Sequence, residues 1–261
     1  MILTQNPRMF RTFGAVACLS ILSFATACGN SSDKANDETA TANQTSVEVN
    51  HDPLPEGTAP ASLILNGDNT PAGYTHEPTS AESQGATQDI FGDTNDDDRP
   101  TTVPEQCAGA VVDGTTFLDW LFQPAETTAV TSFTRTDNED AAVQVMVSTQ
   151  PADPSQYPKD VAECATTTRT SDRSEWATAK EFEVSPVDLN VQGADTLVAA
   201  QTKLISNKLN GEEVGEGGET LYVYTGSVRG APFTIASTTT MTADEFSALA
   251  TAQAKKISEA S

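Results

Sequence analysis

Basic residues are scarce in this chain. Only 14 Lys and Arg stand against 37 Asp and Glu, which gives a formal net charge of −23 at pH 7. Binding to nucleic acid or to anionic headgroups needs clustered Lys and Arg side chains. The composition therefore excludes nucleic acid as a partner, and it favours a soluble domain that attracts cations or basic partners.

Histidine is almost missing, which limits the possible catalytic chemistry. The two histidines are His51 and His76. A Ser-His-Asp arrangement would have to use His76, and no G-x-S-x-G turn is present. We expect His76 to be an exposed loop residue.

Asp119 is the only acid in an apolar setting, where a raised pKa would suit acid–base catalysis. On an alternating strand it would point to solvent, so we predict no catalytic residue and no enzymatic activity.

No hydrophobic run is long enough to cross a bilayer, which takes roughly 20 residues. The apolar run over residues 13–27 follows Arg8 and Arg11, the only charges before it, and polar sequence begins directly after Gly29. A basic start, a short apolar run and small residues before the cut are typical of a secretory signal. Residues 25–29 read Ala-Thr-Ala-Cys-Gly, which is similar to the signal of a bacterial lipoprotein. Cys28 is then the predicted site of lipidation by palmitate.

The predicted signal implies a location on the extracytoplasmic face of the cell membrane, where the lipid on Cys28 holds the protein. Cys18 also fits the pattern loosely, but hydrophobic sequence continues past it. Cleavage before Cys28 would remove Arg8 and Arg11 and no acid, so the net charge of −23 would become −25.

Cysteine usage agrees with export. Cys18 would leave with the signal and Cys28 would be acylated, so Cys107 and Cys164 remain of the four cysteines. Two cysteines in an exported domain usually form a disulfide. Closing this loop would stabilise the fold by about 4 kcal/mol on the entropic account. A redox or metal pair would need C-x-x-C spacing or histidine partners, which are missing.

The sequence divides into three parts. Residues 1–27 are the predicted signal peptide, and residues 28–58 are the lipidated cysteine with a polar tether that is too poor in large apolar residues to fold. Such a coil would hold the domain on the order of 30 Å from the membrane. Residues 59–261 are long enough for one globular domain with a single core.

Periodicity within residues 59–261 predicts an α+β fold, in which helices pack on an antiparallel sheet and one disulfide joins two helices. A capping-box pattern over residues 102–105 predicts a helix that carries Cys107, and a second helix after Pro158 would carry Cys164. Residues 117–122 could be a strand or a helix. Alternating apolar residues predict strands near 142–147, 182–184 and 198–204, and a hairpin over 221–235. Thr242 and Glu245 predict the start of a C-terminal helix, whose buried stripe would be Phe246, Leu249, Ala250 and Ile257.

Residues 93–98 begin like a calcium loop, with oxygen-bearing side chains at alternate positions. Asp98 replaces the glycine that such a loop needs, and Pro104 stands where the bidentate glutamate should be. A solvated acidic loop is therefore the preferred interpretation, and we predict no metal site and no cofactor.

The glycine-rich residues 211–218 are acidic and lack the lysine of a phosphate-binding loop. Trp120, Tyr222, Tyr224 and Phe233 could line a pocket, but the default expectation is that they form the core.

Several short motifs together resemble a known family. They are residues 63–65 (Leu-Ile-Leu), 71–74 (Pro-Ala-Gly-Tyr) and 104–107 (Pro-Glu-Gln-Cys), followed by Cys164 and a terminal hairpin and helix. The chain resembles actinobacterial cell-envelope lipoproteins related to the extracellular sensor domain of the PknH-type serine/threonine kinases. Those sensor domains carry two disulfides around a cleft, whereas this chain can form one. The resemblance implies a binding or sensor protein that has no kinase domain.

Three functions remain open from the sequence. The preferred one is a non-enzymatic, lipid-anchored module that binds a small ligand, a cell-wall component or a protein. The second is a carrier that shields an envelope lipid between sheet and helix, for which a large apolar cavity would be required. The third is a hydrolase with two carboxylates facing each other in a cleft.

Overall fold

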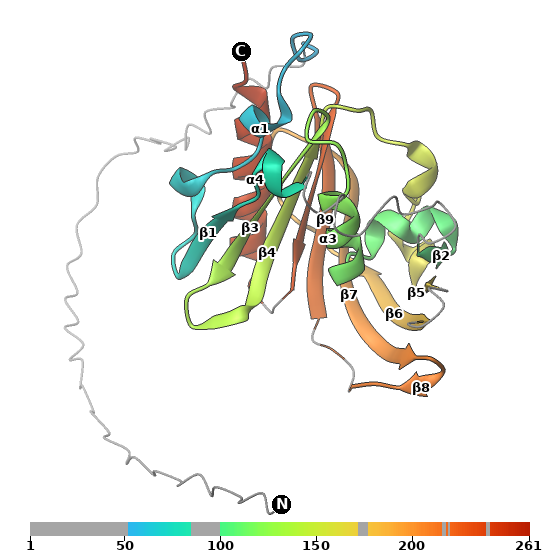
Figure 1. Ribbon diagram of the computed structural model, residues 1–261. Helices are drawn as coiled ribbons and strands as arrows, with labels where there is room; N and C mark the ends of the chain where they lie inside the picture. Colours follow the sequence, from blue (N-terminus) through green and yellow to red (C-terminus); the bar gives the residue numbers. More distant parts are fainter. Residues whose placement is uncertain (1–51, 85–99, 172–176, 216–217, 219, 239–240) are drawn as a thin grey trace, which may run out of the picture. The chain divides into compact units, whose positions relative to one another are not determined.

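The computed structural model describes residues 52–84, 100–171, 177–215, 218, 220–238 and 241–261 (Figure 1). In this part of the chain ten strands form one sheet with antiparallel pairing throughout, as the sequence predicted. Only one described helix is longer than eight residues. The fold is therefore mostly sheet, and α+β describes it only approximately.

The strand order across the sheet is β1-β3-β4-β10-β9-β7-β6-β5-β2, and β8 pairs with β7 outside this order. The strands are β1 (Tyr74–Pro78), β2 (Thr101–Val103), β3 (Thr128–Arg135), β4 (Asn138–Ser148), β5 (Thr166–Ser171), β6 (Thr178–Pro186), β7 (Asp195–Leu209), β8 (Glu212–Glu213), β9 (Thr220–Val228) and β10 (Ala231–Ser237). The helices are α1 (Pro60–Leu63), α3 (Gly114–Leu121) and α4 (Ala243–Ser258), with 3₁₀ turns η1 (Gly67–Asn69), η3 (Glu105–Ala110), η4 (Pro154–Gln156) and η5 (Val161–Cys164).

Helix α4 covers one face of the central strands. Its start is the predicted capping box, since Thr242 Oγ1 accepts from Glu245 N at 3.2 Å and Glu245 Oε2 accepts from Thr242 N at 3.0 Å. The predicted stripe is confirmed, and its residues pack with strand residues of β3, β4, β9 and β10 into the main core. The fully buried members of this stripe and its partners include Phe246, Ala250, Ile257, Phe133, Val145, Phe233 and Ile235.

Helix α3 covers the opposite face. Neighbouring residues of a strand point to opposite faces, so Val223 and Ala236 lie away from the core under α4 and pack instead with Trp120 of α3. Residues 117–122, which the sequence left open as strand or helix, thus belong to a helix and its C-cap. Trp120, Tyr224 and Phe233 are buried, as the core interpretation predicted, and the fourth aromatic residue of that set, Tyr222, is partly buried against the main core.

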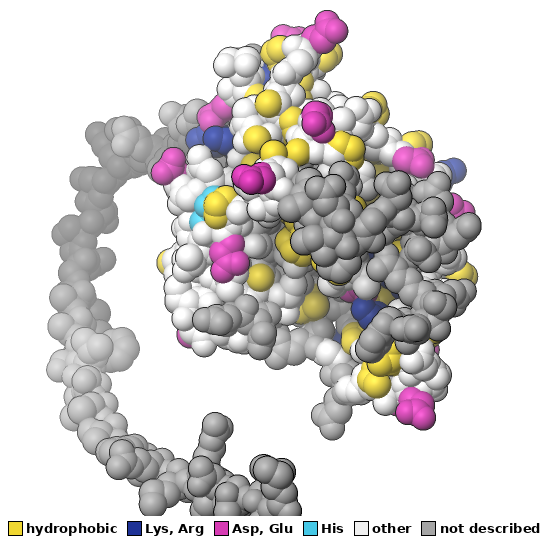
Figure 2. All heavy atoms as spheres, in the orientation of Figure 1, with side chains coloured by type: hydrophobic (Ala, Val, Ile, Leu, Met, Phe, Trp, Pro, Cys, Tyr) yellow, Lys and Arg dark blue, Asp and Glu magenta, His cyan; other side chains and the backbone are white. Residues whose placement is uncertain are grey.

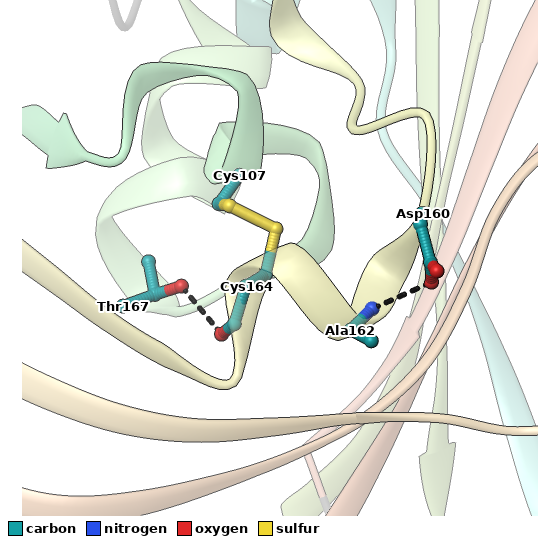
Figure 3. The surroundings of a disulfide bond; sticks show 5 residues. All are labelled: Cys107, Asp160, Ala162, Cys164 and Thr167. Atoms are coloured by element: carbon teal, nitrogen blue, oxygen red, sulfur yellow. Dashed lines mark hydrogen bonds between the residues drawn. A yellow bond between two sulfur atoms is a disulfide. The ribbon is translucent and has the colours of Figure 1, made fainter.

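The disulfide between Cys107 and Cys164 is present, with the two Cα atoms 5.6 Å apart (Figure 3). The predicted pair of α-helices around it is wrong. Thr102 belongs to the strand β2, where it pairs with Arg169 of β5, and Pro104 precedes the 3₁₀ turn η3. Because the residue before a proline avoids the helical region, Val103 stays extended and the helix cannot begin at Thr102. The second cysteine ends η5, whose start is capped by Asp160 Oδ1 accepting from Ala162 N at 2.9 Å.

A buried glutamine joins the first and last described segments of the core. Gln253 of α4 is fully buried. Its Oε1 accepts from Leu65 N at 3.1 Å, and its Nε2 donates to Leu63 O at 2.7 Å. The side chain thereby satisfies two main-chain groups outside the sheet, one on the last residue of α1 and one just after it.

Replacing Gln253 by leucine is expected to destabilise the protein by about 2–4 kcal/mol, because two buried main-chain groups would lose their partners while the volume stays similar. Urea denaturation followed by circular dichroism would measure this loss. Lys255→Leu, an exposed position on the same helix, is the matched control and should change stability by less than about 0.5 kcal/mol. Equal effects of the two substitutions would contradict the role assigned to Gln253.

Candidate functional site

A cluster of four charged side chains lies between α3 and the sheet. Asp113 Oδ2 accepts from Lys180 Nζ of β6 at 2.6 Å, and Asp113 Oδ1 lies 3.6 Å from Arg169 Nη1 of β5. Arg169 Nη2 reaches Asp119 Oδ2 of α3 at 3.4 Å. Two acids thus face two bases, and the cluster carries no net charge.

Asp113 is also the N-cap of α3. Its Oδ1 accepts from the main-chain nitrogens of Thr115 at 3.1 Å and Thr116 at 3.0 Å. Arg169 donates to Thr116 Oγ1 and, at 3.4 Å, to Val111 O. The cluster therefore fixes the first turn of α3 on the sheet. Arg169 Nε is buried without a hydrogen-bond partner among the described residues, so this packing leaves one polar atom of the guanidinium unsatisfied.

The pKa of Asp113 lies well below its usual range. Burial would raise this pKa, but the charges of Arg169 and Lys180 and the hydrogen bonds from Lys180 and Thr115 lower it by more. A carboxyl whose pKa is lower in the folded than in the unfolded chain stabilises the fold above its unfolded pKa of about 3.9. This contribution is lost as the pH falls from there toward the folded pKa.

Asp113→Asn keeps a good N-cap but removes the charge, so we expect a loss of about 3 kcal/mol in unfolding free energy at pH 7. The variant should also lose less additional stability than the native chain between about pH 4 and pH 2. Chemical denaturation at a series of pH values would measure both effects. Asp153→Asn is the control: the exposed Asp153 caps η4 by accepting from Ser155 N at 2.9 Å and has no ion pair within the described part. Hydrogen bonds from Ser155 alone lower the pKa of Asp153, so this substitution should change both the stability at pH 7 and its pH dependence less than Asp113→Asn does. If the unfolding free energy of Asp113→Asn depended on pH in the same way as that of the native chain, this assignment would be contradicted.

A pocket of about 590 Å³ opens at one end of the sheet. Its walls are residues 53–61, which lead into α1, the turn 125–127 before β3, residues 149–150 after β4, and the β9–β10 turn 229–231. Volumes between about 300 and 1,000 Å³ are typical of small-ligand sites. The lining is mainly Pro, Ala, Gly and Leu, with Glu56, Glu126 and Arg229 as its charged residues.

Two similar turns, far apart in the sequence, each form part of this lining. Residues 55–58 (Pro-Glu-Gly-Thr) close with Thr58 N donating to Pro55 O at 3.2 Å, and Gly57 adopts a φ of +79°. Residues 124–127 (Pro-Ala-Glu-Thr) close with Thr127 N donating to Pro124 O at 3.0 Å. In both turns the threonine Oγ1 also donates to the proline carbonyl, at 2.7 Å and 3.1 Å. Each turn thus holds one glutamate at a central position.

Arg229 joins the pocket to both ends of the described domain. It has a φ of +55° in the two-residue turn of the hairpin, with Gly230 at +83°. Its Nε donates to Asp52 O at 2.7 Å and its Nη2 to Pro53 O at 3.2 Å. Its Nη1 donates to Ser258 O at 3.5 Å and to Ala260 O at 2.5 Å. The guanidinium is thus directed at main-chain carbonyls rather than at a ligand.

The residues that the sequence analysis weighed for catalysis, His76 and Asp119, do not line the pocket. The expectation that His76 is an exposed loop residue is wrong: it lies half-buried on β1, where its Nε2 is 2.8 Å from Thr131 Oγ1 and its ring is 5.2 Å from that of Phe133. Asp119 lies on a helix and pairs with Arg169 instead of pointing freely into solvent from a strand. Cys28 and the acidic residues 93–98 lie outside the described residues.

The sequence did not lead to a prediction of this pocket, although two segments of its lining share a short sequence pattern. The Pro-x-x-Thr pattern occurs in both turns, but nothing local shows that chain segments more than 60 residues apart meet.

The described residues contain no group of three or more His, Cys, Asp or Glu side chains that could hold a metal ion. They also contain no helix with the length and apolar character needed to cross a membrane.

Comparisons with known proteins add little. No protein-family model matches the sequence, and the comparison with curated proteins gives no match. Among solved structures, the chain is similar to a putative uncharacterized protein (Rv0999 ortholog) from Mycobacterium smegmatis, at 13% identity and a TM-score of 0.38, over 78% of this chain and 98% of that chain. That protein comes from an actinobacterium. A likeness of this degree carries no argument about function, so the resemblance to sensor-type lipoproteins stays a prediction.

Proposed function

We propose that the protein is a lipid-anchored, extracytoplasmic binding module without enzymatic activity, and that it holds its ligand in the pocket at the end of the sheet. The observation that carries this proposal is the pocket itself, with a volume of about 590 Å³ and a lining of both apolar and polar residues. One wall is formed by residues 53–61, which overlap the end of the segment 28–58 that the sequence assigns to the tether. A ligand bound there would lie beside the point where the domain joins its anchor.

The packing of the interior favours this function over a carrier of envelope lipid. A lipid between sheet and helix would need space between α4 and the strands beneath it. That space is filled by large side chains that are fully buried, among them Phe133, Phe233, Phe246 and Ile257. An acyl chain could enter only by displacing them, which costs several kcal/mol for each aromatic side chain moved.

The charge cluster gives little support to a hydrolase. A glycosidase pair needs one protonated and one ionised carboxyl facing a cleft. Asp113 and Asp119 both pair with Arg169, and the pKa of Asp113 is lowered rather than raised. We therefore retain the prediction that the protein has no catalytic residue.

The anchoring part of the proposal is tested at Cys28. Cys28→Ala is expected to abolish incorporation of labelled palmitate and to release the protein from the membrane fraction, because the acylated thiol would be missing. Cys18→Ala is the matched control and should retain both label and membrane association. Loss of label in Cys18→Ala with retention in Cys28→Ala would move the anchor to the other cysteine and contradict the assignment.

The binding part is tested by filling the pocket. Ala61 is exposed and lines the pocket, so Ala61→Trp is expected to occupy part of its volume with little effect on the core. Native mass spectrometry of the full chain purified from the membranes of its own host should detect a bound compound that Ala61→Trp lacks. Ala248→Trp, at an exposed position of α4 outside the pocket, should retain it. A compound retained by both variants would place binding elsewhere, and a chain free of any compound would leave the proposal unsupported.

A further inference from the structure

We infer that the pocket selects a ligand that carries an ammonium or guanidinium group on a short apolar stem. The inference rests on the proposed function and specifies the chemistry of the ligand. It follows from the charges that line the pocket, the way in which they are held, and the apolar surface between them.

The charged groups of the pocket leave an excess of negative charge. Arg229 directs its guanidinium at the carbonyls of Asp52, Pro53, Ser258 and Ala260. Glu56 and Glu126 have neither an ion pair nor a side-chain hydrogen bond within the described part of the chain. The lining thus offers two unpaired carboxylates and an arginine that is already engaged. An anion would be repelled there, and a cation would find partners.

Both carboxylates project from turns that are closed before any ligand arrives. Each turn has a proline at its first position and a threonine that donates from both its nitrogen and its hydroxyl to the proline carbonyl. The second turn is further fixed by Thr128 N, which donates to Pro124 O at 3.0 Å, and by the helix α3 before it. Ordering the two loops therefore costs little on binding.

The rest of the lining suits methylene groups. Leu54, Pro55, Ala61 and Ala125 are exposed or half-buried and contribute apolar side chains to the lining. Lysine side chains and aliphatic amines bury their methylene stems on such surface while the charged end reaches a carboxylate. A free aliphatic amine and a lysine or arginine side chain of a partner share this chemistry.

The general charge of the protein also attracts cations, so specific binding has to be separated from it. The chain has a net charge of −23, and acidic side chains are scattered over the visible face in Figure 2, among few basic ones. Glu77 on β1 and Glu183 on β6 are exposed carboxylates outside the pocket. Replacing them changes the net charge as much as replacing Glu56 and Glu126.

The test uses isothermal titration calorimetry on the full chain in uncharged detergent at low ionic strength. The probes share a five-carbon stem and differ in charge: 1,5-diaminopentane, 1,5-pentanediol and glutarate. An acetyl-Ala-Lys-Ala-amide peptide represents a lysine side chain of a partner. We expect the diamine, the peptide or both to bind, and the diol and glutarate to bind at least tenfold more weakly. The double variant Glu56→Gln/Glu126→Gln should weaken binding of the cationic probe about tenfold, which corresponds to about 1.4 kcal/mol from two exposed charge contacts.

The control double variant Glu77→Gln/Glu183→Gln should bind the cationic probe within about twofold of the native chain. Binding by the peptide alone would assign the site to a protein partner, and binding by the diamine alone would assign it to a free amine. Equal weakening in both double variants would reduce the effect to general charge and overturn the inference, as would the failure of both cationic probes. A different result would separate this inference from the proposed function. If the diol or glutarate bound to the native chain and to Glu56→Gln/Glu126→Gln but not to Ala61→Trp, the pocket would remain a binding site. Only the inference about a cationic ligand would then be lost.

Discussion

Complete burial of the strand β10 is the constraint on which the rest of the structure depends. Every residue of Ala231–Ser237 is buried, so both faces of the strand have to be covered. Ile235 packs under α4, and its neighbour Ala236 packs with Trp120 of α3. Because the strands on either side, β4 and β9, pair with β10 over most of its length, the two helices define the positions of the central strands. The two helices thus bury both faces of the central strands, and the disulfide-linked turns η3 and η5 pack on β6 and β7.

The same arrangement positions the pocket. The ion pairs of Asp113 fix the start of α3, and the helix leads through Phe122 and Gln123 into the turn that carries Glu126. On the other side, Gln253 of α4 holds the main chain after α1, and α1 follows the turn that carries Glu56. The two walls are thus supported by buried polar contacts on opposite faces of the sheet. The core therefore adds to the preorganisation that the hydrogen bonds within the two turns already provide.

The sequence predicted those elements whose signal is local. The helix α4 has its capping box and its stripe within 16 residues, and the alternating residues of β4 need no knowledge of their partner. Thr102 shows the limit, because its pattern with Glu105 is a valid capping box, yet pairing with β5 and the proline at position 104 outweigh it. Asp119 and His76 were placed wrongly because their partners, Arg169 and Thr131, lie 50 and 55 residues away in the sequence. The pocket could not be predicted at all, since four separate segments form it.

The hydrogen bonds of Arg229 also determine how the domain would respond to mechanical force. A pull on the chain before Asp52 would first load the contacts from the guanidinium to Asp52 O and Pro53 O. From there the load would pass to the turn between β9 and β10, in the middle of the sheet, and to the end of α4. Tension along the chain would thus reach the wall of the pocket before it reached the core. Rupture of these hydrogen bonds would detach Asp52 and Pro53 from Arg229 at the wall of the pocket without breaking any main-chain pair of the sheet.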